Sequence, residues 1–458
     1  MKLWNRRNWL SAAASAPCLG LSLRLSGGGL AAAPGASEPI AWTHAKIVTA
    51  AGPVINDGTL VVQGGSILAV GPSDTTTVPA GAKSYDATGK WIMPGLVCTH
   101  SHIGGVGAAD GSAPIQPGVR ILDAINVKEA GFKRALAGGL TTLNIMPGSG
   151  HLISGQTVYC KLRYAGKGPA TIDEILIRDN DGKPIGGLKM ANGTNSQGDA
   201  PFPGTRGKSA FLVREQYIKA REYHAKRTAA KGDPDKLPPR DLHLEALIEA
   251  MQGTRIVHHH THRHDDIITV LRLSQEFGFR VVLHHVSEGW KVAKEIAAAK
   301  AACSVIVIDS PGGKLEARDM TFKNGRILDE AGVRVAFHTD DWITDSRVFN
   351  RSAALAVRAG MNRDRALEAL TIAGAEMLGL EHRIGSLSPG KDADFCLLSG
   401  DPLSVYSRVL ETWVEGQQAF DLSDPDDALY AEGGQGAGFD LNPYLCCFGQ
   451  AWQNAGAK

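Results

Sequence analysis

Ten of the 15 histidines in this chain gather in four short stretches, and each stretch follows a run of apolar residues. The stretches are His100-Ser101-His102, residues 258–264, His284-His285, and His338 just before Thr339-Asp340. Alternate residues of a β-strand point to the same face, so His100 and His102 would project together from a strand end. Imidazole nitrogens and carboxylate oxygens are ligands for Zn²⁺ and related ions. The pattern therefore predicts one metal site to which several strands each contribute ligands.

The elements that carry these stretches alternate between strand and helix from about residue 91. Helices are predicted over 131–139, 241–252, 265–277, 290–302, 327–331 and 363–378, and strands over 140–145, 255–260, 279–284, 304–308 and 333–337. This alternation favours a parallel sheet with crossover helices, and a span of about 290 residues fits a (β/α)₈ barrel. A doubly wound open sheet is the alternative. In a barrel the carboxyl ends of all strands face one mouth, where the histidines would meet.

Composition and the N-terminus narrow the class of protein. The chain has 458 residues, a net charge of +1 and 43% hydrophobic residues, which is typical of a globular protein and gives no general attraction to nucleic acid. Residues 1–36 are predicted to be a twin-arginine-type signal peptide, because Arg6-Arg7 precede a mildly apolar stretch. We therefore expect a bacterial protein exported to the periplasm, with no membrane anchoring after signal removal. Between residues 40 and 90, short β-branched runs predict an antiparallel unit.

Several of these segments resemble the amidohydrolase superfamily, in particular its imidazolonepropionase-like and prolidase-like branch. The resemblance lies in residues 93–102, the histidines at the strand ends, His338-Thr339-Asp340, and the Gly-Lys-Asp-Ala-Asp motif within residues 385–395. It implies an α/β fold, with a TIM-like (β/α)₈ barrel over residues 91–383. It also implies a small β-sandwich built from both flanks, residues 37–90 and 384–422, which leaves 423–458 as a C-terminal extension.

The resemblance also implies a set of metal ligands drawn from different strands. The set is His100, His102, Lys189, His260, His262, His285 and Asp340. His260 and His262 are alternatives for the fifth strand, with His260 preferred. Lys189 is the candidate for a carboxylated bridge between two metals, and without a bridge the site would hold one. Because side chains alternate along a strand, His284 is expected to face away from His285.

The chemistry implied is that of a metal-dependent amidohydrolase. One or two divalent ions, with zinc preferred over iron or manganese, would activate a water to attack an amide, cyclic amide or small peptide. Asp340 and His285 are the predicted catalytic residues. Asp340 is expected to take the proton of the water and return it to the leaving nitrogen, while a histidine polarises the carbonyl oxygen.

Two other functions stay open at this point. A deaminase of the same superfamily is one, because Glu288 lies three residues after His285, and a catalytically inactive periplasmic metal-binding protein is the other. The glycine-rich residues 147–157 are a candidate for holding a group of a small-molecule substrate. Four cations are candidates for the same role: Arg206, Arg214, Arg263 and Arg347. The charged residues 208–230 predict a surface helix, and a homo-oligomer is left open.

Overall fold

The computed structural model describes residues 38–433, apart from residues 108, 308–313 and 342. The predicted signal peptide and the part of the predicted extension beyond residue 433 lie outside the described residues. Among the described residues, none of the helices has both the length and the apolar character needed to cross a membrane.

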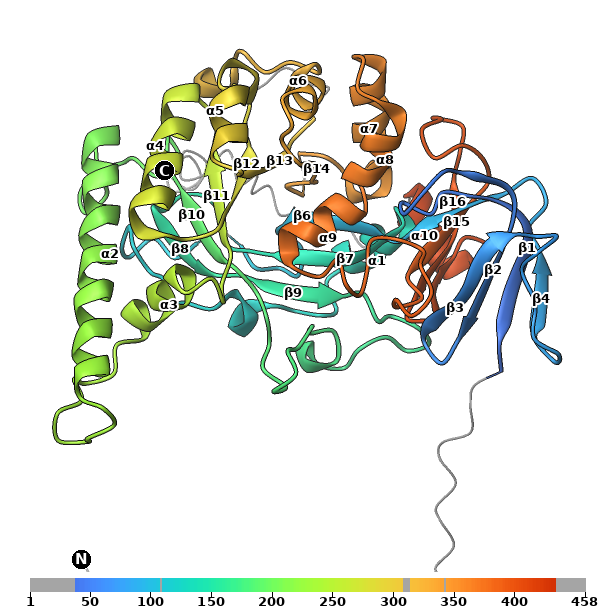
Figure 1. Ribbon diagram of the computed structural model, residues 1–458, viewed down its shortest axis with the longest axis horizontal. Coiled ribbons are helices and arrows are strands. Elements are labelled where there is room, and N and C mark those ends of the chain that lie inside the picture. The colour runs from blue at the N-terminus through green and yellow to red at the C-terminus, as the bar shows by residue number, and fades with distance from the viewer. Residues whose placement is uncertain (1–37, 108, 308–313, 342, 434–458) are drawn as a thin grey trace, which may run out of the picture. The chain divides into compact units, whose positions relative to one another are not determined.

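One sheet combines strands from the two ends of the chain. It contains β1 (Ile40–Ile47), β2 (Ile55–Gln63), β3 (Ser66–Pro72), β4 (Lys83–Asp86), β5 (Trp91–Pro94), β15 (Phe395–Leu398), β16 (Val409–Val414) and β17 (Gln417–Asp421). The order is β17-β16-β15-β5-β1-β2-β3, and β4 pairs with β1. In Figure 1 the blue strands and the red strands meet in this sheet. Trp42, Phe395 and Trp413 pack in its core. A division into two packed layers stays a prediction.

A second sheet carries most of the strand–helix alternation. Its order is β14 (Val335–Phe337), β13 (Ala302–Val305), β12 (Val281–His285), β11 (Val257–Thr261), β10 (Leu188–Ala191) and β8 (Ile153–Gln156). Strands β10 to β14 are parallel. The connecting helices are α3 (Leu242–Met251), α4 (His264–Phe277), α5 (Ala293–Ala298) and α6 (Asn324–Glu330). The predicted mixed α/β architecture with parallel strands is confirmed for this part of the chain.

A third sheet holds the first histidine stretch, and it departs from the predicted alternation. It contains β6 (Leu96–Ser101), β7 (Leu140–Ile145) and β9 (Val158–Lys161), and β9 runs antiparallel to β7. Residues 146–187, all described, contain no α-helix. Instead, β8 and β9 are separated only by Thr157 and pair with β10 and β7 respectively. One extended segment thus joins the edges of two sheets where a crossover helix was expected.

The remaining helices lie before, between and after these strands. They are α1 (Gly131–Ala137), α2 (Arg206–Ala229), α7 (Asn350–Arg358), α8 (Arg363–Ala369), α9 (Ile372–Leu378) and α10 (Pro425–Glu432). Helix α2 confirms the predicted surface helix. The helix predicted over 363–378 is instead two helices, because the Leu370 carbonyl accepts a hydrogen bond from the Val97 N–H of β6 and Thr371 leaves helical geometry. The strand that carries His100 is thereby tied to α8.

A buried ionic cluster joins β9 to the first sheet. The Lys161 ammonium is fully buried and lies 3.0 Å from an Asp394 oxygen and 3.2 Å from Glu415 Oε1, and it also contacts Asp392. Arg163 donates to the same Glu415 at 2.6 Å. Asp392 and Asp394 belong to the Gly-Lys-Asp-Ala-Asp motif, so the structure gives that motif a role in holding the strands together.

Candidate metal centre

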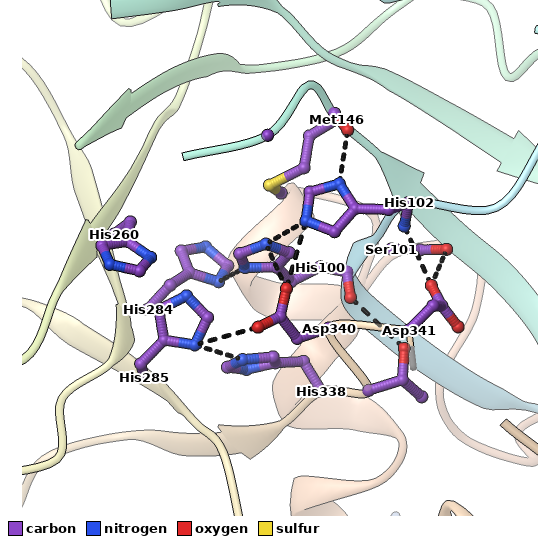
Figure 2. A network of polar contacts seen from close by, with 12 residues as sticks. His100, Ser101, His102, Met146, His260, His284, His285, His338, Asp340 and Asp341 are labelled. Atoms are coloured by element: carbon purple, nitrogen blue, oxygen red, sulfur yellow. Dashed lines mark hydrogen bonds and ion pairs between the residues drawn. The ribbon is translucent and has the colours of Figure 1, made fainter. Parts of the chain in front are cut away.

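Four polar side chains from three strand ends converge on one point. His100 Nε2 lies 3.1 Å from His102 Nε2 and 3.3 Å from Asp340 Oδ1, and His102 Nε2 lies 3.1 Å from the same oxygen. The Lys189 amine, from β10, lies 3.2 Å from His100 Nε2. Figure 2 shows the His100, His102 and Asp340 side chains turned toward one another. His100, Lys189 and Asp340 are completely buried, so the fold rather than solvent holds them in place.

Neighbouring groups fix the ring of His102 and the end of β6. The His102 Nδ1–H donates to the Met146 carbonyl at 2.8 Å, and because a carbonyl only accepts, Nε2 must carry the lone pair. Asp341 accepts from the His102 backbone N–H at 2.9 Å and from the Ser101 hydroxyl at 2.5 Å. Asp341 thus positions the histidine pair, while Asp340 faces it.

His285 reaches the same centre through an unusual backbone. Its φ is 69°, that of Val286 is 46° and that of Asp340 is 50°, which is left-handed geometry that non-glycine residues seldom adopt. His285 Nδ1 lies 3.8 Å from Asp340 Oδ2 and 3.1 Å from His338 Nε2. His285 Nε2 is buried and has no hydrogen-bond partner among the described residues. These turned residues aim the ring and the carboxylate inward at the strand ends.

His260 and His262 form a neighbouring group with Glu316. Their ligand atoms lie within 4.8 Å of one another, and the rings of His260 and His285 are 4.3 Å apart between centroids. The Lys314 ammonium lies 3.5 Å from His260 Nε2, 3.4 Å from His262 Nε2 and 3.6 Å from Glu316 Oε1. A cationic side chain therefore stands among three groups that could bind a metal ion.

The histidines of the centre are held neutral by their surroundings. Burial lowers the pKa of His100 and His285 well below the ordinary value, and Lys189 and the nearby rings lower it further. Burial likewise lowers the pKa of His260, with Lys314 adding to the effect. A neutral imidazole is the form that binds a metal ion.

The donor set fits a divalent cation. The lone pair of His102 Nε2 faces His100 Nε2 and the Asp340 carboxylate, an arrangement that a positive ion between them would satisfy. His285 offers a further buried nitrogen that no described residue satisfies. Imidazole nitrogens with a carboxylate suit zinc, iron or manganese, and a second ion could use His260 or His262.

The structure separates the predicted residues into two groups. His100, His102, Lys189, His285 and Asp340 lie together, whereas His260 and His262 lie in the adjoining group with Glu316. The roles of these residues as ligands, and of Lys189 as a carboxylated bridge, stay predictions.

Four residues of the centre have contacts that the sequence does not predict. The expectation that His284 faces away is wrong, because His284 Nδ1 lies 3.2 Å from His100 Nδ1. The φ of 69° at His285 ends the regular alternation on which that expectation relied. The sequence places His338 at a strand end and in the motif His338-Thr339-Asp340 but does not predict its contact with His285, and no motif points to Lys314 or Glu316.

The predicted anion-binding cations are all engaged elsewhere. Each forms an ion pair with a nearby carboxylate: Arg206 with Asp266, Arg214 with Glu276, Arg263 with Asp265, and Arg347 with Asp345. The structure therefore gives no support to these arginines as anchors for a substrate. Residues 147–157 contain β8, whose Ile153 and Gly155 pair with β10.

Comparisons with known proteins place this chain in a family. A family profile described as "Amidohydrolase family" matches residues 242–420. The solved structure of an amidohydrolase from Thermotoga maritima is similar with a TM-score of 0.76 and 30% identity, covering 83% of this chain and 100% of that one. The chain belongs to the amidohydrolase superfamily, a class of hydrolases that act on carbon–nitrogen bonds.

Curated relatives carry several names within that class. Amidohydrolase tasK of Hapsidospora irregularis is 28% identical over 393 residues, which is 80% of this chain and 40% of tasK. This chain therefore spans less than half the length of that relative. A 5-methylthioadenosine/S-adenosylhomocysteine deaminase of Symbiobacterium thermophilum is 24% identical, covering 76% of this chain and 82% of its own length. Imidazolonepropionases match over shorter stretches, as the branch named from the sequence predicts.

Proposed function

We propose that this protein is a metal-dependent amidohydrolase that cleaves the C–N bond of an amide, a cyclic amide or a small peptide. The observation that carries the proposal is the buried convergence of His100, His102 and Asp340, with Lys189 and His285 beside them. A pure metal store has no need of a carboxylate placed for proton transfer, which weighs against an inactive metal-binding protein.

The chain supplies the proton transfers of the reaction. A bound divalent ion would lower the pKa of a water to about 7, making hydroxide available at neutral pH. Asp340 Oδ1 faces the two first-strand histidines and Oδ2 faces His285, so its carboxylate can take a proton from water on one side and deliver it to a leaving nitrogen. His285 Nε2, which no described residue satisfies, is placed to polarise the carbonyl oxygen or to hold the ion.

The number and kind of ions follow from the same side chains. His100, His102 and Asp340 offer one set of donors, with His285 beside it, and His260, His262 and Glu316 offer a second. Lys189, within 3.2 Å of His100 Nε2, is the candidate for the bridge between the two positions. We propose zinc as the ion, with iron and manganese as alternatives.

A deaminase is the second candidate, and relatives with that name favour it. Its expected proton carrier would be Glu288, but that carboxylate accepts from the His264 backbone N–H at 3.0 Å and ring at 2.7 Å, and from Lys291 at 2.9 Å. Burial would raise the pKa of Glu288, yet these donors lower it to about 2. A carboxylate that stays ionised in this way is a poor proton carrier near neutral pH. The contacts therefore favour Asp340 as the proton carrier and cleavage of an amide rather than deamination.

Other features of the proposal concern the setting of the site. We infer that the two sheets of parallel strands belong to one (β/α)₈ barrel, since the segment β8–β9 links them and the Asp340 N–H donates to the His100 carbonyl across the other edge. The β-sandwich formed by the two flanks, the twin-arginine export to the periplasm and a homo-oligomer are carried forward as proposals from the sequence.

The decisive experiment combines metal content with one substitution. The protein should bind one or two divalent ions per chain and hydrolyse acyl dipeptides or cyclic amides. Asp340→Asn should keep the metal and lose turnover by about a hundredfold or more. Asp57→Asn, a matched change on an exposed residue of β2, should alter neither. Release of ammonia from aminopurines with Glu288→Gln inactive would establish the deaminase instead, and absence of metal would refute both.

A further inference from the structure

A line of buried side chains runs from the metal centre into the interior of the sheets. His100 Nδ1 lies 3.2 Å from His284 Nδ1, His284 Nε2 lies 2.9 Å from His258 Nδ1, and His258 Nε2 lies 3.0 Å from the Tyr159 hydroxyl. The four residues come from β6, β12, β11 and β9, and each is at most 2% exposed. The last three are not among the metal ligands predicted from the sequence.

Each of the three neutral imidazole rings has only two tautomers, with its proton on Nδ1 or on Nε2. His284 and His258 are completely buried, and each of their ring nitrogens contacts another ring or the Tyr159 hydroxyl rather than a carboxylate, which favours neutral rings. A neutral imidazole carries one N–H and one lone pair. Of two ring nitrogens in contact, one must donate and the other accept. The tautomer of His100 therefore fixes the tautomer of His284, which in turn fixes that of His258.

A cation bound at the proposed metal centre would determine the tautomer of His100. His100 Nε2 faces the Lys189 amine at 3.2 Å and Asp340 at 3.3 Å, in the place where a cation fits. To offer a lone pair to a cation there, His100 must carry its proton on Nδ1. That N–H donates to His284 Nδ1, the His284 Nε2–H donates to His258 Nδ1, and the His258 Nε2–H donates to the Tyr159 oxygen.

We propose that His284, His258 and Tyr159 are positioning residues that hold His100 in its metal-binding tautomer through this one-way chain of hydrogen bonds. The inference rests on the proposed metal centre and adds three residues to it. Tyr159 can end the chain because a hydroxyl accepts as well as donates. No proton enters or leaves the chain, and its direction alone decides whether His100 presents a lone pair or an N–H to the ion.

Removing the far end of the chain should therefore weaken metal binding at a distance. In Tyr159→Phe the His258 Nε2–H loses its acceptor, and a buried N–H without a partner is costlier than a buried acceptor without one. The unpaired N–H is avoided if every hydrogen bond of the chain reverses its direction. His100 then carries its proton on Nε2, where it prevents binding of the ion. We expect the affinity for Zn²⁺ to fall about fivefold, the value of one net hydrogen bond.

Three further variants make the effect specific. Tyr164→Phe is the matched control, because it removes another buried hydroxyl, one that donates to the Val127 carbonyl at 2.8 Å outside the chain, and it should bind Zn²⁺ like the wild type. His284→Leu should weaken Zn²⁺ binding roughly 10- to 100-fold, as loss of an outer hydrogen-bond partner of a ligand does. His284→Gln should restore most of it, since an amide can accept from His100 and donate to His258.

The test is Zn²⁺ calorimetry on these full-length variants together with ¹⁵N NMR of histidine-labelled, Zn²⁺-loaded protein. The proposal requires His284 and His258 to carry their protons on Nε2, with the order of affinities given above. An Nδ1–H tautomer at His258, or equal affinities for Tyr159→Phe and Tyr164→Phe, would overturn it. Failure to bind Zn²⁺ at all would overturn the proposed function as well, so the two failures are distinguishable.

Discussion

Lys161→Met should remove the positive charge on which a buried carboxylate depends. Lys161 contacts three carboxylates, but Arg163 also pairs with Glu415 and Arg383 also pairs with Asp392. Asp394 is 4% exposed, and among the described residues its carboxylate would keep only the hydrogen bond from the Glu415 N–H at 2.9 Å, so the variant would leave its negative charge buried without a cation. Breaking a buried ion pair on one side costs about 3–5 kcal/mol of unfolding free energy.

Protonation of Asp394 limits that loss and makes it depend on pH. Burial already raises the pKa of Asp394, with Lys161 opposing the rise, so the pKa should climb further in the variant. Protonating a carboxyl of ordinary pKa about 3.9 costs about 4 kcal/mol at pH 7 and about 1.5 kcal/mol at pH 5. Because the folded variant then holds a proton that the unfolded chain releases, its stability should fall as pH rises from about 4.

Urea unfolding of wild type and variant at both pH values measures this difference. We expect a deficit near 4 kcal/mol at pH 7 that shrinks by more than half at pH 5. Lys219→Met is the control, because Lys219 is half exposed and pairs with Glu215 on the surface of α2, where a pair is worth about 0.5 kcal/mol. A deficit below about 1 kcal/mol at pH 7, or an equal deficit at both pH values, would refute the account of the cluster.

Three further predictions follow from single contacts. Lys314→Met should tighten binding of a second Zn²⁺ about tenfold in calorimetry, because it removes a positive charge from the group around His260, and weaker binding would contradict this. Glu288→Gln should cost about 1–2 kcal/mol above pH 4.5 in urea unfolding, and the loss should vanish as pH falls toward 2, where the wild-type carboxylate takes up its proton. Gly95→Ala should lower stability by about 1–3 kcal/mol, since its Cβ would meet Thr141 Oγ1 at 2.2 Å, whereas Gly52→Ala, which points into open space, should not.

The strand ends of the candidate site could be predicted because their signals are local. An apolar run that ends in His100-Ser101-His102 defines both a strand and the direction of its side chains. The same holds for β11, β12 and β14, where each histidine stretch closes a short buried strand. Their meeting point follows once the strands are parallel.

The parts that could not be predicted depend on contacts between distant residues. Lys314 stands beside His260 and His262 although more than fifty residues separate them in the sequence, and its sequence surroundings contain no motif. The turned backbone at His285, whose ring lies near His100 together with that of His284, has no signal in the residue types. The ion pairs of Arg206 with Asp266 and of Arg214 with Glu276 are likewise set by packing between distant residues.

The sheet shared by both ends of the chain has a consequence for synthesis and folding. Strand β5 pairs on one side with β15, whose Phe395–Leu398 leaves the ribosome some three hundred residues later. Until then the edge of β5 carries unpaired backbone groups, and an exposed edge strand invites pairing with another chain. Contacts between such distant residues also slow folding, because a long loop must close before they contribute. We expect truncations before residue 395 to aggregate even though every histidine of the site is already present.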